Sequence, residues 1–270
     1  MRAIEDQMTR RGHTETMGAR RPSRPYTMLT GLTEWTAKKF GWSDPGVEDE
    51  FVPLYEKCRE FTGTSWERMY ALYKSVKYVL ESRVPGDLVE CGVWRGGSVM
   101  MIAYTLLSAG VTDRNLFLYD TFEGMSKPTP EDADSTSRTP AEIRWREGAR
   151  GTGNAWASAS LGDVKRNVYS TGYPQNRLTF VKGRVEETIP RTVPERISLL
   201  RLDTVWYAST KHELEHLYPR LVREGVLVLD DYGHWLGARK AVDEYFASHP
   251  PAPLLNRVDY TGRVGIKSRE

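Results

Sequence analysis

The sequence predicts an α/β fold with a mostly parallel sheet of seven strands. Strand-sized apolar runs alternate with helical patterns between about residues 84 and 248. This alternation implies strand–helix–strand units with right-handed crossovers, which produce a parallel sheet. Two further runs, on either side of Thr261-Gly262, predict a terminal antiparallel hairpin.

The elements follow in order along the chain. A helix is expected first, capped by Thr64 or Ser65 and ended by the turn signal at Pro85-Gly86. Strands are expected at 87–92, 115–120, 178–183, 197–203, 225–231, 254–260 and 263–267. Helices are expected between them at 98–107, 161–169, 210–221 and 238–248.

Three segments lie outside the alternating core of this pattern. Residues 1–25 contain six arginines, which predicts a disordered basic tail, with a phosphate-binding arm as the alternative. Residues 26–80 are expected to form a helical N-terminal extension, and residues 81–270 the α/β domain. Within that domain, residues 126–160 are rich in Pro, Ser, Thr and Gly. Their length suggests an active-site lid, with a surface insertion as the alternative.

Composition argues against several classes of protein. The chain has 270 residues, 38 Lys and Arg against 36 Asp and Glu, and a net charge of +2, whereas nucleic-acid binders carry a basic stripe. No stretch approaches the ~18 apolar residues of a membrane span, and no secretory signal is visible. Two cysteines are too few for a disulfide framework. We therefore expect a cytoplasmic protein with no nucleic-acid or membrane partner.

The turn after the first strand carries the strongest local signal, the string ECGVWRGGS from Glu90 to Ser98. Gly92 and Gly96 let the backbone approach a ligand, and the N-terminus of the following helix offers free N–H groups. The spacing differs from the G-x-G-x-x-G of dinucleotide enzymes, and the lysine of a phosphate loop is missing. The alternative is a tight turn that needs glycine for packing.

Acidic residues end three of the expected strands. Asp120 ends the second strand, where it can accept hydrogen bonds from ribose hydroxyls; a local contact with Thr121 is the alternative. Asp203 ends the fourth strand, and Asp230 and Asp231 end the fifth. In a parallel sheet these strand ends lie at one edge, and three carboxylates without cysteine suit Mg²⁺ or Ca²⁺. The alternatives are a helix cap and an ion pair.

Four strings together resemble a known family. VPGDLVECGVWRGG (84–97), DTFEG (120–124), LDT (202–204) and DDY (230–232) are similar to the macrocin O-methyltransferase (TylF/MycF) family over about residues 64–267. The resemblance implies a class I, Rossmann-like methyltransferase that uses S-adenosylmethionine and Mg²⁺ on sugar hydroxyls of natural products. It also implies a small-molecule acceptor, expected to be a glycosylated natural product, and a homodimer or higher homo-oligomer.

The resemblance also implies roles for individual residues. The positions expected at the cofactor are Glu90, Gly92, Gly96, Ser98, Asp120, Thr121, Gly183 and Asp203. Asp120 matches the ribose ligand, and Gly183 falls near the adenine. Asp203, Asp230 and Asp231 match the metal carboxylates of the family.

One position departs from the family pattern. Val205 stands where relatives carry an acid assigned as the general base, and valine cannot take a proton. Four alternatives follow from this. In the first, His234 replaces the base, and in the second, a metal-bound hydroxyl loses its proton to Asp203 or solvent. In the third, the acceptor is a group that needs no strong base, such as an amine or a carboxylate. In the fourth, the site is impaired or serves another reaction, such as a cyclisation or isomerisation. Metal-assisted hydroxyl methylation, with Asp203 and His234 as catalytic residues, is the first expectation.

Overall fold

The computed structural model describes residues 46–151 and 153–269. The predicted tail at 1–25 lies outside the described residues, as does the predicted extension up to residue 45. The fold described below is that of the compact unit Glu48–Glu270.

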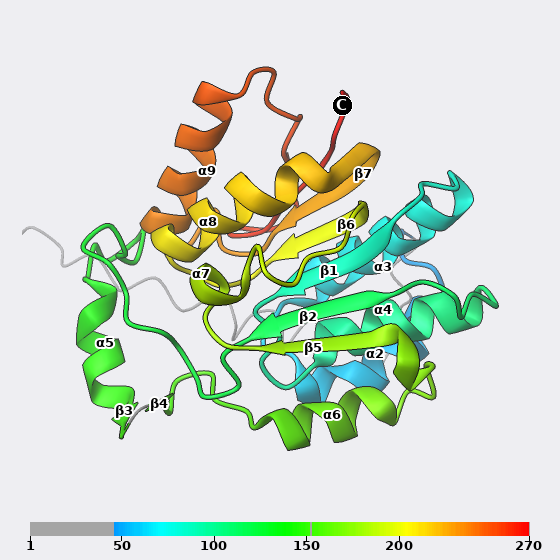
Figure 1. Cartoon of the computed structure of the whole chain (residues 1–270), viewed down its shortest axis with the longest axis horizontal. Coiled ribbons are helices and arrows are strands. Elements are labelled where there is room, and N and C mark those ends of the chain that lie inside the picture. The colour runs from blue at the N-terminus through cyan, green and yellow to red at the C-terminus, as the bar shows by residue number, and fades with distance from the viewer. Residues whose placement is uncertain (1–45, 152, 270) are drawn as a thin grey trace, which may run out of the picture. The chain divides into compact units, whose positions relative to one another are not determined.

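Among the described residues, seven strands form one sheet in the order β5-β2-β1-β6-β7-β9-β8 (Figure 1). The parallel strands are β1 (Asp87–Cys91), β2 (Leu116–Asp120), β5 (Leu178–Lys182), β6 (Ile197–Leu202) and β7 (Leu221–Leu229). Antiparallel pairs join β9 (Arg263–Ile266) to β7 and to β8 (Asn256–Arg257). The predicted mixed sheet with a terminal hairpin is confirmed.

Strand order places the switch point of the fold beside β1. The chain runs outward from β1 through β2 to β5, then returns to the other side of β1 for β6 and β7. Every residue of β6 is buried, as expected for a strand covered on both faces. Ligands of such sheets bind outside the carboxyl ends of the strands at this switch point.

Helices cover both faces of the sheet (Figure 1). One face carries α2 (Phe51–Cys58), the short η1 (Arg59–Phe61), α3 (Trp66–Glu81), α4 (Gly97–Ser108) and α6 (Leu161–Tyr169). The other carries α7 (Val185–Thr188), α8 (Tyr207–Leu217) and α9 (Leu236–Ser248). The remaining short turns are η2 (Gln175–Arg177) and η3 (Tyr218–Arg220). No helix of the described residues is long and apolar enough to cross a membrane.

Several predicted boundaries were wrong. The strand predicted at 254–260 is only the short β8. The helix predicted at 210–221 spans Tyr207–Leu217, because a 3₁₀ turn with Pro219 in its first positions begins at Tyr218 and leads directly into β7 at Leu221. The strand predicted from 225 therefore starts four residues earlier. Its pairing with β6 breaks after Leu221 and resumes at Val226, which is the regular stretch that the apolar pattern identified.

The predicted lid segment contains structure of its own. It holds α5 (Ala141–Gly148) and a small hairpin of β3 (Ala149–Arg150) and β4 (Gly153–Asn154). Its first half is fastened to the domain, since Asp132 is buried and accepts hydrogen bonds from the backbone N–H groups of Tyr207 at 2.7 Å and Thr129 at 2.7 Å. Its second half is fastened too, since the backbone N–H of Asn154 donates to the carbonyl of Glu123 at 2.9 Å. The role of the segment as a lid stays a prediction.

Candidate active site

A cavity of about 700 Å³ opens at the carboxyl ends of β1, β6 and β7, within the size range of small-molecule sites. Eight of the predicted site residues line it: Gly92, Asp120, Thr121, Gly183, Asp203, Asp230, Asp231 and His234. The others, Glu90, Gly96 and Ser98, do not line it. The structure therefore brings the strand-end residues together and places part of the glycine turn behind them.

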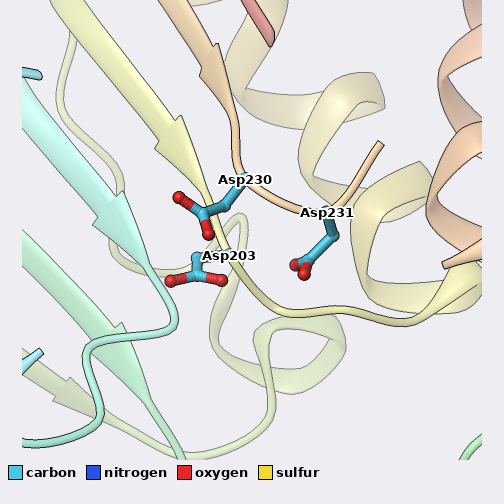
Figure 2. A group of neighbouring side chains, drawn as sticks. All are labelled: Asp203, Asp230 and Asp231. Carbon is cyan, nitrogen blue, oxygen red and sulfur yellow. The ribbon is translucent and has the colours of Figure 1, made fainter. Parts of the chain in front are cut away.

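Asp203, Asp230 and Asp231 face one another at the ends of β6 and β7 (Figure 2). One ligand atom from each lies within 4.8 Å of the others. Oδ2 of Asp231 is buried and has no hydrogen-bond partner among the described residues. Three hard oxygen donors, one of them unpartnered, fit Mg²⁺ or Ca²⁺ by the chemistry of the donor set.

Arg201 forms ion pairs with two members of this cluster. This role was not predicted from the sequence. The Arg201 side chain is 2% exposed and donates from Nη2 to Asp203 at 2.8 Å and to Asp230 at 2.7 Å. Its Nη1 donates to Oε1 of Glu90 at 2.6 Å. The sequence contains an indication of this role, because an arginine inside the apolar run of β6 is buried and requires buried partners.

Glu90, a predicted cofactor ligand, has a structural role in the described residues, and its contact with the cofactor stays a prediction. Its side chain is 2% exposed, lies behind the cavity wall and forms an ion pair with Arg201. Burial raises the pKa of Glu90 to about 8, although the Arg201 guanidinium acts in the opposite direction. Glu90 therefore anchors the arginine that aligns two of the carboxylates.

A second arginine reaches the cluster from α3. Arg68 forms an ion pair with Asp230 through Nη1 and another with Asp259 through Nε at 3.0 Å. Thr64 also donates its hydroxyl to Asp230, at 3.1 Å from Oδ1. The predicted cap of α3 is confirmed, since Oγ of Ser65 accepts a hydrogen bond from the backbone N–H of Arg68 at 3.2 Å. The start of α3 is thus tied to the end of β7.

Arg201 and Arg68 oppose the effect of burial on the pKa values of the three carboxyl groups, and the outcome differs from one to the next. Burial alone would raise the pKa of Asp230, but Arg201 and Arg68 hold it below its usual value. Burial and the neighbouring acids raise the pKa of Asp231 well above its usual value. Burial raises the pKa of Asp203 to about 6, with Arg201 opposing the shift. The least compensated carboxylate is therefore Asp231, the one with the unpartnered oxygen.

The glycine turn packs β1 against β6. Gly92 has a φ of +87°, and a Cβ there would lie 2.1 Å from the carbonyl oxygen of Asp203. Only glycine permits this approach. Gly96 caps α4 with a φ of +95°. The packing alternative thus explains both glycines, while Gly92 also lines the cavity.

Asp120 joins the end of β2 to the same turn. Oδ2 accepts hydrogen bonds from the backbone N–H groups of Val93 at 2.7 Å and Trp94 at 3.0 Å, and Oδ1 from that of Phe122 at 2.7 Å. Burial raises its pKa, and these N–H groups partly offset the shift. The contact with Thr121 is long, at 3.4 Å. The ribose contact of Asp120 stays a prediction, beside a structural role that is now visible.

His234 lies on the cavity wall between β7 and α9. Its Nε2 is 3.4 Å from Oδ2 of Asp134, and its buried Nδ1 has no partner among the described residues. Ser135 fastens the backbone, donating its N–H to the carbonyl of His234 at 2.8 Å. Burial lowers the pKa of His234, Asp134 opposes that shift, and Arg144 adds to it. The imidazole is therefore neutral near pH 7 and able to accept a proton.

Val205 occupies a strained turn at the cavity. Its φ is +74°, and the N–H of Trp206 donates to the carbonyl of Thr204 at 2.9 Å, which is the hydrogen bond of a γ-turn. Positive φ is unfavourable for a β-branched residue. The turn is held from α8, where the fully buried Glu213 accepts a hydrogen bond from Oγ1 of Thr204 at 3.1 Å.

Three tryptophans form a cluster beside the cavity. Trp156 from the predicted lid, Trp206 after β6 and Trp235 after β7 pack edge to face or tilted, with ring centroids 5.3–5.8 Å apart. Val205 and Met125 pack against this tryptophan cluster. Trp156 and Trp235 line the cavity, whereas Trp206 is buried and does not.

Comparison with known proteins identifies the family. The sequence profile described as Macrocin-O-methyltransferase (TylF) matches residues 58–264. The chain belongs to the macrocin O-methyltransferase family. It is accordingly an S-adenosylmethionine-dependent methyltransferase, as the resemblance implied.

Individual relatives agree with this assignment. The chain is 34% identical over 196 residues to the 8-demethyl-8-(2,3-dimethoxy-alpha-L-rhamnosyl)-tetracenomycin-C 4'-O-methyltransferase of Streptomyces olivaceus, covering 73% of this chain and 71% of that one. It is 32% identical to the mycinamicin III 3''-O-methyltransferase of Micromonospora griseorubida, covering 73% and 74%. The solved structure of the O-methyltransferase NovP matches with a TM-score of 0.68, at 26% identity, over 90% of this chain and 99% of that one.

Proposed function

We propose that this methyltransferase transfers a methyl group to a hydroxyl of a small molecule, the sugar of a glycosylated natural product, with the help of Mg²⁺. The names of two relatives support the acceptor class, since one acts on a rhamnosyl tetracenomycin and the other on mycinamicin III. The observation that carries the proposal is the cluster of three strand-end carboxylates inside the cavity.

Asp203, Asp230 and Asp231 are the residues that would hold the cation. Their mutual spacing, the unpartnered Oδ2 of Asp231 and the purely oxygen donor set all suit Mg²⁺. A bound Mg²⁺ supplies Lewis acidity, which lowers the pKa of an acceptor hydroxyl. Arg201 and Arg68 fix Asp230, so the carboxylates are held in place before any ligand arrives.

The cofactor is proposed to lie along β1 and β2, against Gly92, Asp120, Thr121 and Gly183, with Asp203 at the border to the metal site. S-adenosylmethionine supplies the methyl group as a sulfonium. The walls of the cavity orient the two reactants, and such alignment contributes several kcal/mol to catalysis.

We propose His234 as the residue that accepts the hydroxyl proton. It lines the cavity, its imidazole is neutral near pH 7, and its side chain is oriented by Asp134. Val205 has no group that can take a proton. Asp203, whose pKa burial raises to about 6, is the second candidate acceptor.

A second function is altered chemistry on the same fold. Val205 packs against the tryptophan cluster, so the cavity has no acid at this position that could accept a proton. Reactions that need no strong base would be compatible with this part of the cavity. They are methylation of an amine or a carboxylate, and a cyclisation or isomerisation without methyl transfer. Mass spectrometry of the product distinguishes these cases as a gain of one methyl group on oxygen or elsewhere, or an isomer.

The direct test is incubation with S-adenosylmethionine, Mg²⁺ and candidate glycosides, followed by assay for S-adenosylhomocysteine. We expect product formation that a chelator abolishes and that Asp203→Asn lowers by about 10²–10³-fold, as expected for loss of a metal ligand. Asp113→Asn, at an exposed position, is the matched control. Turnover insensitive to both chelator and Asp203→Asn would show that the metal role is wrong.

The remaining expectations are also proposals. We propose that the enzyme acts in the cytoplasm as a homodimer or higher homo-oligomer, which the family resemblance supports. Sedimentation equilibrium of the full chain tests the oligomeric state, and a single species at the mass of one chain, 30.8 kDa, would contradict it.

A further inference from the structure

Three arginines lie along the cavity, and one of them differs from the other two. Arg68 pairs with Asp230 and Asp259, and Arg184 lies 3.5 Å from Glu186. Arg144 has no carboxylate within ion-pair distance among residues 46–151 and 153–269. Its positive charge is therefore available to something that enters the cavity.

Arg144 is exposed, and its guanidinium stacks on an aromatic ring at the cavity. Its guanidinium lies 4.1 Å from the centroid of the Trp156 ring, and Trp156 packs in turn against Trp206 and Trp235. A guanidinium stacked on an indole keeps its N–H edges free, because the ring contacts only its face. Those edges form a fork that matches the two oxygens of a carboxylate or phosphate.

The surrounding helix shows that this lack of a partner is particular to Arg144. Two turns of α5 carry Arg144 and Arg146, and Arg146 donates to Oε1 of Glu142 at 2.9 Å. Lys127 approaches the same carboxylate at 3.9 Å. Of the two acids of this helix, Glu142 is thus shared by the two cations that do not line the cavity, and Glu147 has no ion pair among the described residues.

We propose that Arg144 binds an oxyanion of the acceptor, so that the substrate is an anionic glycoside. This inference rests on the proposed function and narrows its acceptor class. The anionic group lies at the free N–H edge of the Arg144 guanidinium, while the hydroxyl to be methylated lies toward the carboxylate cluster. The oxyanion is either a carboxylate on the sugar or aglycone, or a phosphate of a nucleotide sugar methylated before glycosyl transfer.

The test uses three probes on the full chain saturated with S-adenosylhomocysteine. p-Nitrophenyl glucuronide and p-nitrophenyl glucoside differ only in the carboxylate at C6, and dTDP-glucose supplies the phosphate arm. Binding is measured by titration calorimetry for the parent protein, Arg144→Gln and the matched control Arg146→Gln. We expect at least one anionic probe to bind about tenfold more tightly than the glucoside, the lower range for a charge-assisted hydrogen bond.

Arg144→Gln should remove that preference, and Arg146→Gln should retain it. Whichever anion is preferred identifies the carboxylate or the phosphate as the source. Equal binding of charged and neutral probes, no binding of any probe, or a preference that survives Arg144→Gln would overturn the inference. The proposed function is judged separately: turnover of neutral glycosides without an anion preference contradicts only the role of Arg144.

Discussion

Two regions around the cavity, the carboxylate end and the tryptophan end, are built in different ways. The carboxylate end consists of residues at the tips of adjacent strands, and two buried or nearly buried arginines neutralise part of its charge. The tryptophan end consists of side chains from three separate loops, packed through ring contacts. The sheet fixes the positions of the residues at the carboxylate end, whereas contacts between loops fix those at the tryptophan end.

This difference suggests a division of labour. The strand tips offer fixed positions for chemistry that every member of a fold can share, because the hydrogen-bonded sheet holds them. Loops tolerate change more easily, so they are where acceptor selectivity is expected to differ. Val205 and His234 line the cavity and contact the tryptophan cluster, and each follows a carboxylate of the other region by two or three residues, which makes them the most informative positions for mutation.

Arg201→Met is expected to have the largest effect, because it removes the counter-charge at the carboxylate end. It leaves Glu90, Asp203 and Asp230 without their shared partner in a buried site. We expect the free energy of unfolding to fall by about 3–5 kcal/mol, measured by urea denaturation at pH 7.5. The exposed Arg191→Met is the control. A loss no larger than that of the control would show that the carboxylates do not depend on Arg201.

His234→Ala should lower methyl transfer by about 10²-fold, at the lower end of what a placed base contributes. His216→Ala, on the surface helix α8 and outside the cavity, should leave the rate unchanged. The measurement is kcat for the hydroxyl acceptor from pH 6 to 9. Full activity of His234→Ala over this range would remove His234 as the proton acceptor.

Val205→Asn tests the strain at the γ-turn beside the cavity. Asparagine tolerates positive φ better than a β-branched residue, so we expect the free energy of unfolding to rise by about 1 kcal/mol. Val205→Thr keeps the branched Cβ and should bring no gain. Equal stability of the two variants would argue against strain. Val205→Asp adds a carboxylate at the same place, and a large gain in methyl transfer would mean that the site lacks a base.

The pH dependence of stability should show the smallest effect. Burial lowers the pKa of folded His234 below its unfolded value of 6.5, so the unfolded state binds the proton more readily. Stability is therefore full above pH 6.5 and declines as pH falls from 6.5 through the folded pKa. His234→Gln should remove this part of the decline in thermal melts between pH 5 and 8. Parallel curves for the two proteins would contradict the lowered pKa.

Sequence reasoning predicted most of the sheet and one end of the site. Apolar runs identified the strands of the seven-stranded sheet but not β3 and β4, and the acids after β6 and β7 were expected at one edge because parallel strands end together. Sequence reasoning could not predict roles that depend on a distant partner. Glu90 was expected at the cofactor, and its pairing with Arg201, which comes 111 residues later in the chain, was not expected.

The predicted lid shows the same limit. Its composition indicated a functional loop, yet nothing local indicates that Asp132 binds the start of α8 or that Asp134 approaches His234. Tertiary contacts of this kind depend on where the loop is fastened. The tryptophan cluster is another case, since Trp156, Trp206 and Trp235 have no spacing in common.

The sequence by itself determined the α/β fold, the edge where ligands bind and the three carboxylates at that edge, because these follow from local periodicity and the geometry of parallel strands. Only the tertiary structure decided which charges are neutralised and which are left open. Arg201 and Arg68 form ion pairs with acids, whereas Arg144 forms none among the described residues. The physical reason is that burial and pairing depend on neighbours distant in the chain, and these set both the pKa of each acid and the availability of each cation.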